Sequence, residues 1–178
     1  MTDSATPPPA PARHAYDAFS PPQIAQLVKQ AGVAKARLPA TQTLVLGLLA
    51  GAFIAFGAMF YTLAVTGSTL GFGPTRLLGG IAFSLGLILV VVAGAELFTG
   101  NNLIVMAWAD GLISGREVAR NWGLVYAANL VGAVATAVIV HLSGMLALDG
   151  GAVGKTAIAI ARFKVELAPD AAFFRGLL

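Results

Sequence analysis

The chain has no cysteine and few charges, and both shortages narrow what it can be. Without cysteine it can form no disulfide and can offer no thiolate to a metal ion. Charged residues make up 11% of the 178 residues and hydrophobic residues 57%, whereas an ordinary soluble domain is about a quarter charged. The net charge is only +3 and the basic residues are scattered, so a nucleic-acid partner has little support. The composition predicts that lipid surrounds most of the chain.

The few charges are unevenly placed. Three stretches, residues 38–75, 77–95 and 121–148, contain no Asp, Glu, Lys or Arg. Each is long enough to cross a hydrocarbon core of about 30 Å, which takes roughly 20 helical residues. The expected fold class is therefore an all-α integral membrane protein with about three full transmembrane helices.

Composition divides the chain into three regions. Residues 1–19 are rich in proline and small residues and are expected to form a disordered tail. Residues 20–37 begin with a helix-start signal at Ser20 and are expected to form an amphipathic helix at the membrane surface, with an ordinary solvated helix as the alternative. Residues 38–178 form the expected transmembrane domain.

Turn residues mark the ends of the expected crossings. Gly47 and Gly51, four residues apart, predict that another helix comes close to the first crossing. The expected elements are a first crossing at about 42–65, a second from 76 or 77 to about 109 with an interruption, a third from 117 or 118 to about 148, a loop at 149–155, a short helix at 156–165 and a further helix start at 169.

Basic residues near the crossing ends predict the orientation. Basic residues precede the first crossing and follow the second, namely Lys29, Lys35 and Arg37 before the first and Arg116 and Arg120 after the second. Two crossings separate the two groups, so both lie on the same side of the membrane. Because cytoplasmic loops are enriched in Lys and Arg, a multi-pass protein of the inner (cytoplasmic) membrane with a cytoplasmic N-terminus is expected.

The second crossing is interrupted by polar residues. Gly94 and Gly100 bracket Glu96 and Thr99, and glycine lets a backbone leave helical geometry without steric cost. A helix broken inside a membrane commonly binds or passes a polar solute. The alternative is that the glycines only pack helices and that Glu96 is a buried, satisfied polar group.

The resuming half of this crossing is expected to begin near Asn101 and Asn102. Free N–H groups and the positive end of a helix dipole there favour an anion, and the Thr99 hydroxyl could add a donor. Glu96 would repel an anion as a carboxylate. It is therefore expected to brace the loop by accepting backbone hydrogen bonds, or to be protonated.

The remaining polar residues of the crossings favour structural roles. His141 stands near the end of its helix, while Trp122, Tyr126 and the asparagines at 121 and 129 fit interfacial anchors and interhelix hydrogen bonds. The sequence shows no nucleotide-binding glycine loop, metal-ligand pair or nucleophile elbow. Neither an enzyme activity nor a cofactor nor a metal is expected.

Three strings of residues resemble the formate/nitrite transporter family: 79–87 (GGIAFSLGL), 94–100 (GAELFTG) and 121–132, which contains Asn-Trp and Tyr-Ala-Ala-Asn. The resemblance implies an aquaporin-like helical bundle of two inverted repeats, with a broken second transmembrane helix. It also implies a homopentamer with a pore in each protomer. The implied solutes are small monovalent anions such as formate, nitrite or hydrosulfide, or their neutral acids.

The resemblance also assigns roles. Thr99 matches a loop threonine that bonds inside the pore, Lys164 a lysine that attracts anions in the outer vestibule, and Glu96 the acid at the base of the loop. Three apolar positions match a constriction, although by spacing alone such residues more often pack against lipid or core: Phe83, Leu87 and Phe98.

The chain departs from the family at its C-terminus. Family members continue into a second broken helix with a central histidine, which His141 does not match. The expected function is transport of small monovalent anions such as formate or nitrite, or of their protonated acids, through a pore within each protomer, with little transport by this chain alone. The alternatives are a truncated, inactive fragment of such a transporter or a non-transporting membrane scaffold. An aquaglyceroporin-like channel is weakened because no Asn-Pro-Ala occurs. The preferred anion and the choice between channel and proton-coupled transport stay open.

Overall fold

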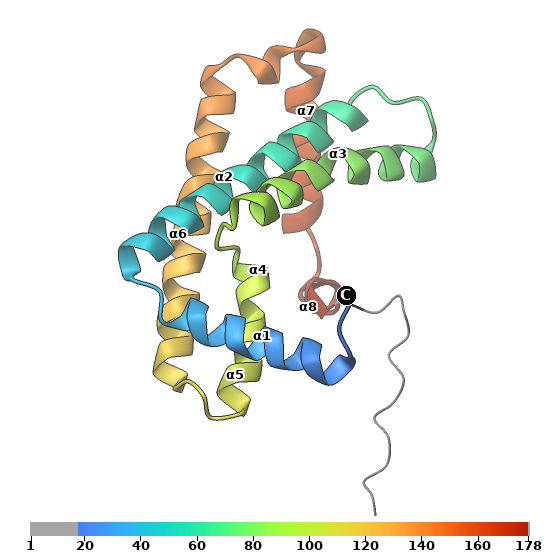
Figure 1. The fold of residues 1–178 in the computed structure, drawn as a ribbon. Coiled ribbons are helices and arrows are strands. Elements are labelled where there is room, and N and C mark those ends of the chain that lie inside the picture. The colour runs from blue at the N-terminus through green and yellow to red at the C-terminus, as the bar shows by residue number, and fades with distance from the viewer. Residues whose placement is uncertain (1–17, 178) are drawn as a thin grey trace, which may run out of the picture.

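A computed structural model describes residues 18–177, and every regular element in that range is a helix (Figure 1). The expected tail at 1–19 lies outside the described residues except for its last two. The elements are α1 Pro21–Ala36, α2 Ala40–Val65, α3 Phe72–Ala93, α4 Phe98–Asn101, η1 Asn102–Ile104, α5 Val105–Ala109, α6 Gly115–Leu142, η2 Met145–Ala147, η3 Asp149–Gly151, α7 Ala152–Val165 and α8 Pro169–Leu177.

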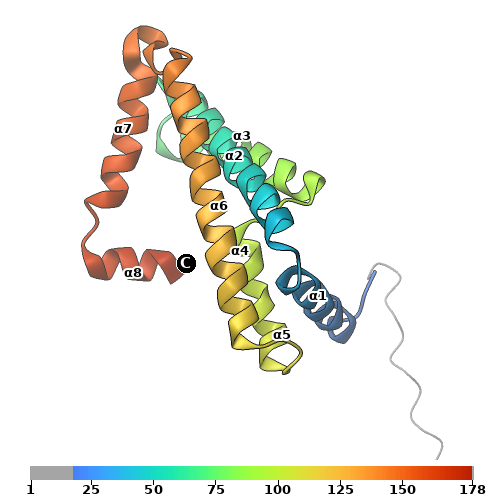
Figure 2. The same ribbon diagram turned by 90° about the vertical axis from the view of Figure 1, so that its left-hand side faces the viewer.

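Three of these helices, α2, α3 and α6, are long and apolar enough to cross a membrane. This confirms the all-α membrane fold with about three full crossings. Helix α2 packs against both of the others, so it lies at the centre of the bundle (Figure 1). The chain then turns back through α7, and α8 runs across the end of α7 (Figure 2).

Several helix ends differ from the expected ones. Helix α6 ends at Leu142 rather than near 148, because Gly144 adopts the left-handed conformation (φ 77°) that ends helices. Helix α3 begins four or five residues earlier than expected, at Phe72, with Pro74 in its first turn, where a missing N–H costs no hydrogen bond. Helix α7 begins at Ala152, inside the expected loop.

Helix α1 lies across the end of the bundle and packs against η1 and α5 (Figure 1). Its start is fixed as the sequence indicates, because the Gln23 side chain accepts a hydrogen bond from the Ser20 backbone N–H at 2.9 Å. Gly32 and Ala36 on its inner face are buried. Ala36 packs in a small apolar core with Ile104 and Ala107. The membrane-surface position of this helix stays a prediction.

Glycines let α2 and α6 touch backbone to backbone, which confirms the close approach expected at Gly47 and Gly51. A Cβ on Gly51 would lie 2.1 Å from the carbonyl oxygen of Asn129 on α6. A Cβ on Gly132 of α6 would lie 2.1 Å from the carbonyl oxygen of Leu48. No side chain fits at such distances, so the crossing depends on these small residues.

Replacing Gly51 with alanine should therefore separate α2 from α6. Because the obstructing atoms belong to the backbone, the helices must shift, and overpacking of this kind costs about 1–3 kcal/mol. We expect the Gly51→Ala protein to lose several degrees of thermal midpoint in detergent.

Gly123→Ala on α6 is the matched control, because nothing lies within 4 Å of its added Cβ. Its midpoint should equal or slightly exceed that of the parent protein, since alanine favours helix. Equal midpoints for the two variants would contradict the tight crossing.

Candidate functional site

The second crossing breaks at Gly94. Helix α3 ends at Ala93, and Gly94 adopts the left-handed conformation (φ 61°), with its N–H and that of Ala95 returning to carbonyls of the last turn. Residues 94–97 are not helical, and α4 starts at Phe98 in a new direction (Figure 1). The break expected from the sequence is therefore present and begins where expected.

The resuming end of the break differs from the expectation. Gly100 lies inside α4 without a positive φ, so Gly94 is the glycine whose freedom the turn requires. The resuming half begins at Phe98 rather than near Asn101, because the Asn101 N–H already donates to the carbonyl of Leu97 at 3.0 Å.

One side chain of α6 bonds backbone groups inside the break and at the start of α4. Asn129 donates through Nδ2 to the carbonyl oxygens of Glu96 at 2.9 Å and Gly47 at 2.8 Å, and its Oδ1 accepts from the N–H of Phe98 at 2.9 Å. The N–H of Glu96 in turn donates to the carbonyl of Leu46 on α2 at 3.2 Å. Backbone groups that lipid could not satisfy thus find partners in neighbouring helices.

The Glu96 side chain belongs to a second network that reaches α1. Its Oε1 lies 2.6 Å from Lys35 Nζ, and its Oε2 accepts from Asn101 Nδ2 at 2.7 Å. Asn101 Nδ2 also donates to Asn121 Oδ1 at 2.9 Å, and Asn121 Nδ2 donates to the carbonyl of Lys35 at 3.0 Å. The indole N–H of Trp122 donates to the carbonyl of Asn101 at 3.1 Å.

The acid and the two amides of this network are buried, whereas the Lys35 side chain is 33% exposed. Glu96 is 4% exposed, and Asn101 and Asn121 are 0% exposed. Glu96 braces the loop through side-chain donors rather than through the backbone N–H groups expected. The ammonium of Lys35 compensates its carboxylate, as a buried charge requires.

Asn101 was expected in the solute path, and the structure places it instead in this buried network. Its Oδ1 has no hydrogen-bond partner among residues 18–177. Rotating the amide would turn this oxygen toward the oxygens of Glu96 and Asn121, so the present orientation is the better one.

Phe98 and Thr99 lie side by side at the start of α4, in different surroundings. Phe98 packs edge-on against Tyr126 and Trp122, with ring centroids 5.5 and 6.3 Å away. Thr99 is exposed, and its hydroxyl makes no hydrogen bond to the part of the chain that the structure describes. Thr99 therefore offers a free hydroxyl next to the break.

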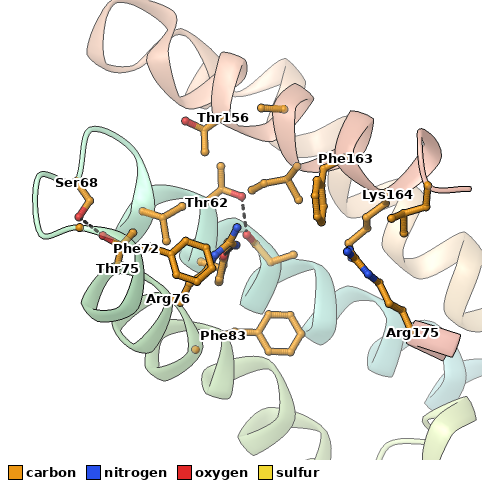
Figure 3. A pocket seen from close by; sticks show the side chains of 18 of the residues that line it. Thr62, Ser68, Phe72, Thr75, Arg76, Phe83, Thr156, Phe163, Lys164 and Arg175 are labelled. Carbon is orange, nitrogen blue, oxygen red and sulfur yellow. Dashed lines mark hydrogen bonds between the residues drawn. The ribbon is translucent and has the colours of Figure 1, made fainter. Parts of the chain in front are cut away.

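A pocket of about 1470 Å³ opens where the far ends of α2 and α3 face α7 and α8 (Figure 3). Phe83 and Lys164, both candidate site residues, line it. Leu87, one turn farther along α3, is about half exposed and lies outside the lining, as do Phe98 and Thr99. The structure thus places Phe83 and Lys164 in the pocket and Phe98 and Thr99 at the loop, with Leu87 in neither group.

Other residues of these two groups were not singled out from the sequence. The pocket also contains Arg76 and Arg175, to which the sequence analysis gave no functional role. Lys35, the partner of Glu96, was used only for orientation. A lone acid in an apolar crossing needs a cation, and that signal could have led to the basic residues of α1.

An all-helical membrane chain in which one crossing is broken at an internally satisfied polar loop has the architecture of a channel or transporter. A profile of the formate/nitrite transporter family matches residues 22–178. The chain belongs to this family.

Relatives of known name are channels and transporters. Formate channel FocA of Escherichia coli (strain K12) is 43% identical over 152 residues, which cover 85% of this chain and 53% of FocA. Uncharacterized transporter YrhG of Bacillus subtilis (strain 168) is 40% identical over 150 residues, covering 83% of this chain and 56% of YrhG. The chain spans about half the length of these relatives.

A solved structure of a pentameric formate channel with formate bound has a TM-score of 0.68 to this chain at 43% identity. The match covers 72% of this chain and 51% of the channel. The helical arrangement described above is thus that of a formate-channel subunit over the shared region.

Replacing Asn129 with leucine should destabilise the backbone around the break. The N–H of Phe98 and the carbonyls of Glu96 and Gly47 would all lose a partner, and each buried unsatisfied group costs about 1–3 kcal/mol. We expect a large fall in thermal midpoint, with faster amide hydrogen exchange at residues 94–98.

Asn102→Leu serves as the control, because Asn102 is exposed and its side chain makes no hydrogen bond within residues 18–177. It should leave both readouts near those of the parent protein. An Asn129→Leu protein as stable as Asn102→Leu would contradict the role of this amide.

The two glycines of the interruption should respond differently to alanine. Gly94→Ala places a side chain in left-handed backbone, at a cost of roughly 1–2 kcal/mol. Gly100→Ala fills an ordinary helical position with open space and should be neutral or stabilising by up to about 1 kcal/mol. Thermal midpoints of the two purified variants check this, and the reverse order would show that the break lies elsewhere.

Proposed function

We propose that this chain forms a membrane pathway for small monovalent anions such as formate or nitrite, or for their protonated acids. The observation that carries the proposal is the break of the second crossing, where Asn129 bonds the carbonyl of Glu96 and the N–H of Phe98 while the Thr99 hydroxyl stays free. A loop held open in this way can offer a hydrogen bond to a solute without unfolding. The names of the relatives, formate channels among them, support the same solute class.

Each candidate residue has its own role along the proposed path. Lys164 draws anions into the outer pocket by its charge, and Thr99 donates a hydrogen bond at the loop. Three apolar side chains form the dry constriction: Phe83, Leu87 and Phe98. Gly94, Glu96 and Gly100 support the loop, and Asn101 joins them rather than the path.

The constriction explains how an anion and its acid are distinguished. Moving a charged group from water into an apolar passage without a partner is very costly, whereas a neutral acid loses far less. An anion gathered in the outer pocket therefore crosses more easily once it is protonated. Flux should rise as the outer side is made more acidic.

For assembly and location we propose a homopentamer, with one pathway per protomer, in the cytoplasmic membrane. The matched solved structure is itself described as pentameric. Apolar side chains such as Ile81, Val92 and Ile139 are exposed on α3 and α6, so they need lipid or a neighbouring subunit around them. Lys29 and Arg37 at the α1 end favour a cytoplasmic N-terminus.

Uptake of labelled formate and nitrite into liposomes tests the proposal. The assay is run on this chain and on a chimera that adds the second half of FocA, because the relatives are about twice as long. For the chimera we expect uptake above that of protein-free liposomes, increasing as external pH falls. Thr99→Ala should lower flux about three- to tenfold, the value of one hydrogen bond, and leave assembly unchanged.

Glu96→Gln is the comparison variant, because it breaks the buried pair with Lys35 and should impair folding as well as flux. Correctly assembled protein that takes up neither anion, as chain or as chimera, would contradict the proposed function. Equal loss of assembly in the Thr99 and Glu96 variants would favour a scaffold.

A further inference from the structure

The outer pocket carries positive charge from three different helices. Arg76 comes from α3, Lys164 from α7 and Arg175 from α8, and all three line the same cavity (Figure 3). No Asp or Glu is among its lining residues within the described part of the chain. Low-dielectric walls of phenylalanine and aliphatic side chains strengthen such an uncompensated field.

Arg76 is held in place by two aromatic residues. Its Nη1 donates a hydrogen bond to the hydroxyl of Tyr61, and its guanidinium carbon lies 5.3 Å from the ring centre of Phe72. A guanidinium carries five N–H donors in one plane. Stacking uses its face and Tyr61 takes one donor, so the rest of the edge is free for a ligand.

Arg175 repeats the stacked arrangement. Its guanidinium carbon lies 5.1 Å from the ring centre of Phe163. Phe163 and its neighbour Lys164 both line the pocket. Lysine differs chemically from the two arginines, because its ammonium is a compact point charge without a planar fork.

We propose that this pocket is a docking site for planar anions with two oxygens, namely carboxylates and nitrite, and that Arg76 reads their shape. The free edge of its guanidinium donates two parallel hydrogen bonds to the two oxygens, while Lys164 supplies attraction that is blind to shape. The inference deepens the proposed function, since it adds selection at the outer mouth. A spherical anion such as chloride gains the attraction but not the paired hydrogen bonds.

Anion binding to the full chain in lipid nanodiscs tests this without any transport step. The probes are ¹³C-formate and chloride, followed by the NMR line broadening of ¹³C and ³⁵Cl. Arg76→Lys keeps the charge and removes the fork, so formate binding should weaken about three- to fivefold and chloride binding less than twofold. Arg76→Gln should weaken the binding of both anions, and Tyr61→Phe should weaken the binding of formate to an intermediate degree.

Arg116→Lys is the control, because Arg116 is exposed at the start of α6, far from the pocket lining. The Arg116→Lys protein should bind both anions as the parent protein does. Thermal midpoints confirm that each variant is folded. Parent-like formate binding in Arg76→Lys, equal losses for both anions, or no binding of formate to the parent protein would overturn the proposal.

The liposome assay separates this inference from the proposed function. Selective loss of formate binding in Arg76→Lys supports the docking site even if the parent protein takes up no formate, in which case the proposed function alone fails. Formate uptake by the parent protein together with unchanged binding in Arg76→Lys overturns the docking site alone.

Discussion

A helix that breaks inside a membrane exposes amide and carbonyl groups where no water can bond them, and the Asn129 side chain meets that need here. Its amide joins Glu96 inside the break and Phe98 at the start of α4 to Gly47 on α2. The reach is possible because Gly51 has no side chain: its Cβ would touch the carbonyl of Asn129 itself. The close helix crossing at Gly51 and the hydrogen bonds of Asn129 to the break therefore depend on each other.

The two ends of the helical bundle differ in their charges. On the α1 side, Lys35 and Glu96 neutralise each other inside a network completed by Asn101 and Asn121. On the far side, the cations of the pocket between α2, α3, α7 and α8 face no acid among those of residues 18–177 that line it. The charges at the α1 end are thus paired with each other and hold the loop, whereas those at the pocket are available to a solute. Thr99 lies next to the loop that the Lys35–Glu96 network holds in place.

The sequence predicted the features that depend on local chemistry. Long apolar runs reveal membrane crossings, and Gly94 marked the break because few other residues accept its left-handed backbone. Where the helix resumes was not predictable, because Phe98 becomes the start only through Asn129, 31 positions away. The partner of Glu96 likewise lies 61 positions away in α1.

The resemblance to a known family placed Phe83 and Lys164, which the structure brings into one pocket. It could not place Asn101, whose burial depends on Glu96 and Asn121 meeting around it. Nor could periodicity show that Arg76 faces the pocket, because this depends on the position of α7 and α8. Pairings across helices are properties of packing rather than of any local string.

An electron cryomicroscopy map of the protein in a lipid bilayer, at a resolution that shows side chains, tests the central claim most directly. The account predicts that α3 ends at Ala93 and that the Asn129 amide lies within hydrogen-bond distance of Glu96 O, Gly47 O and Phe98 N. A continuous helix through residues 94–97, or an Asn129 side chain turned toward lipid, would contradict it.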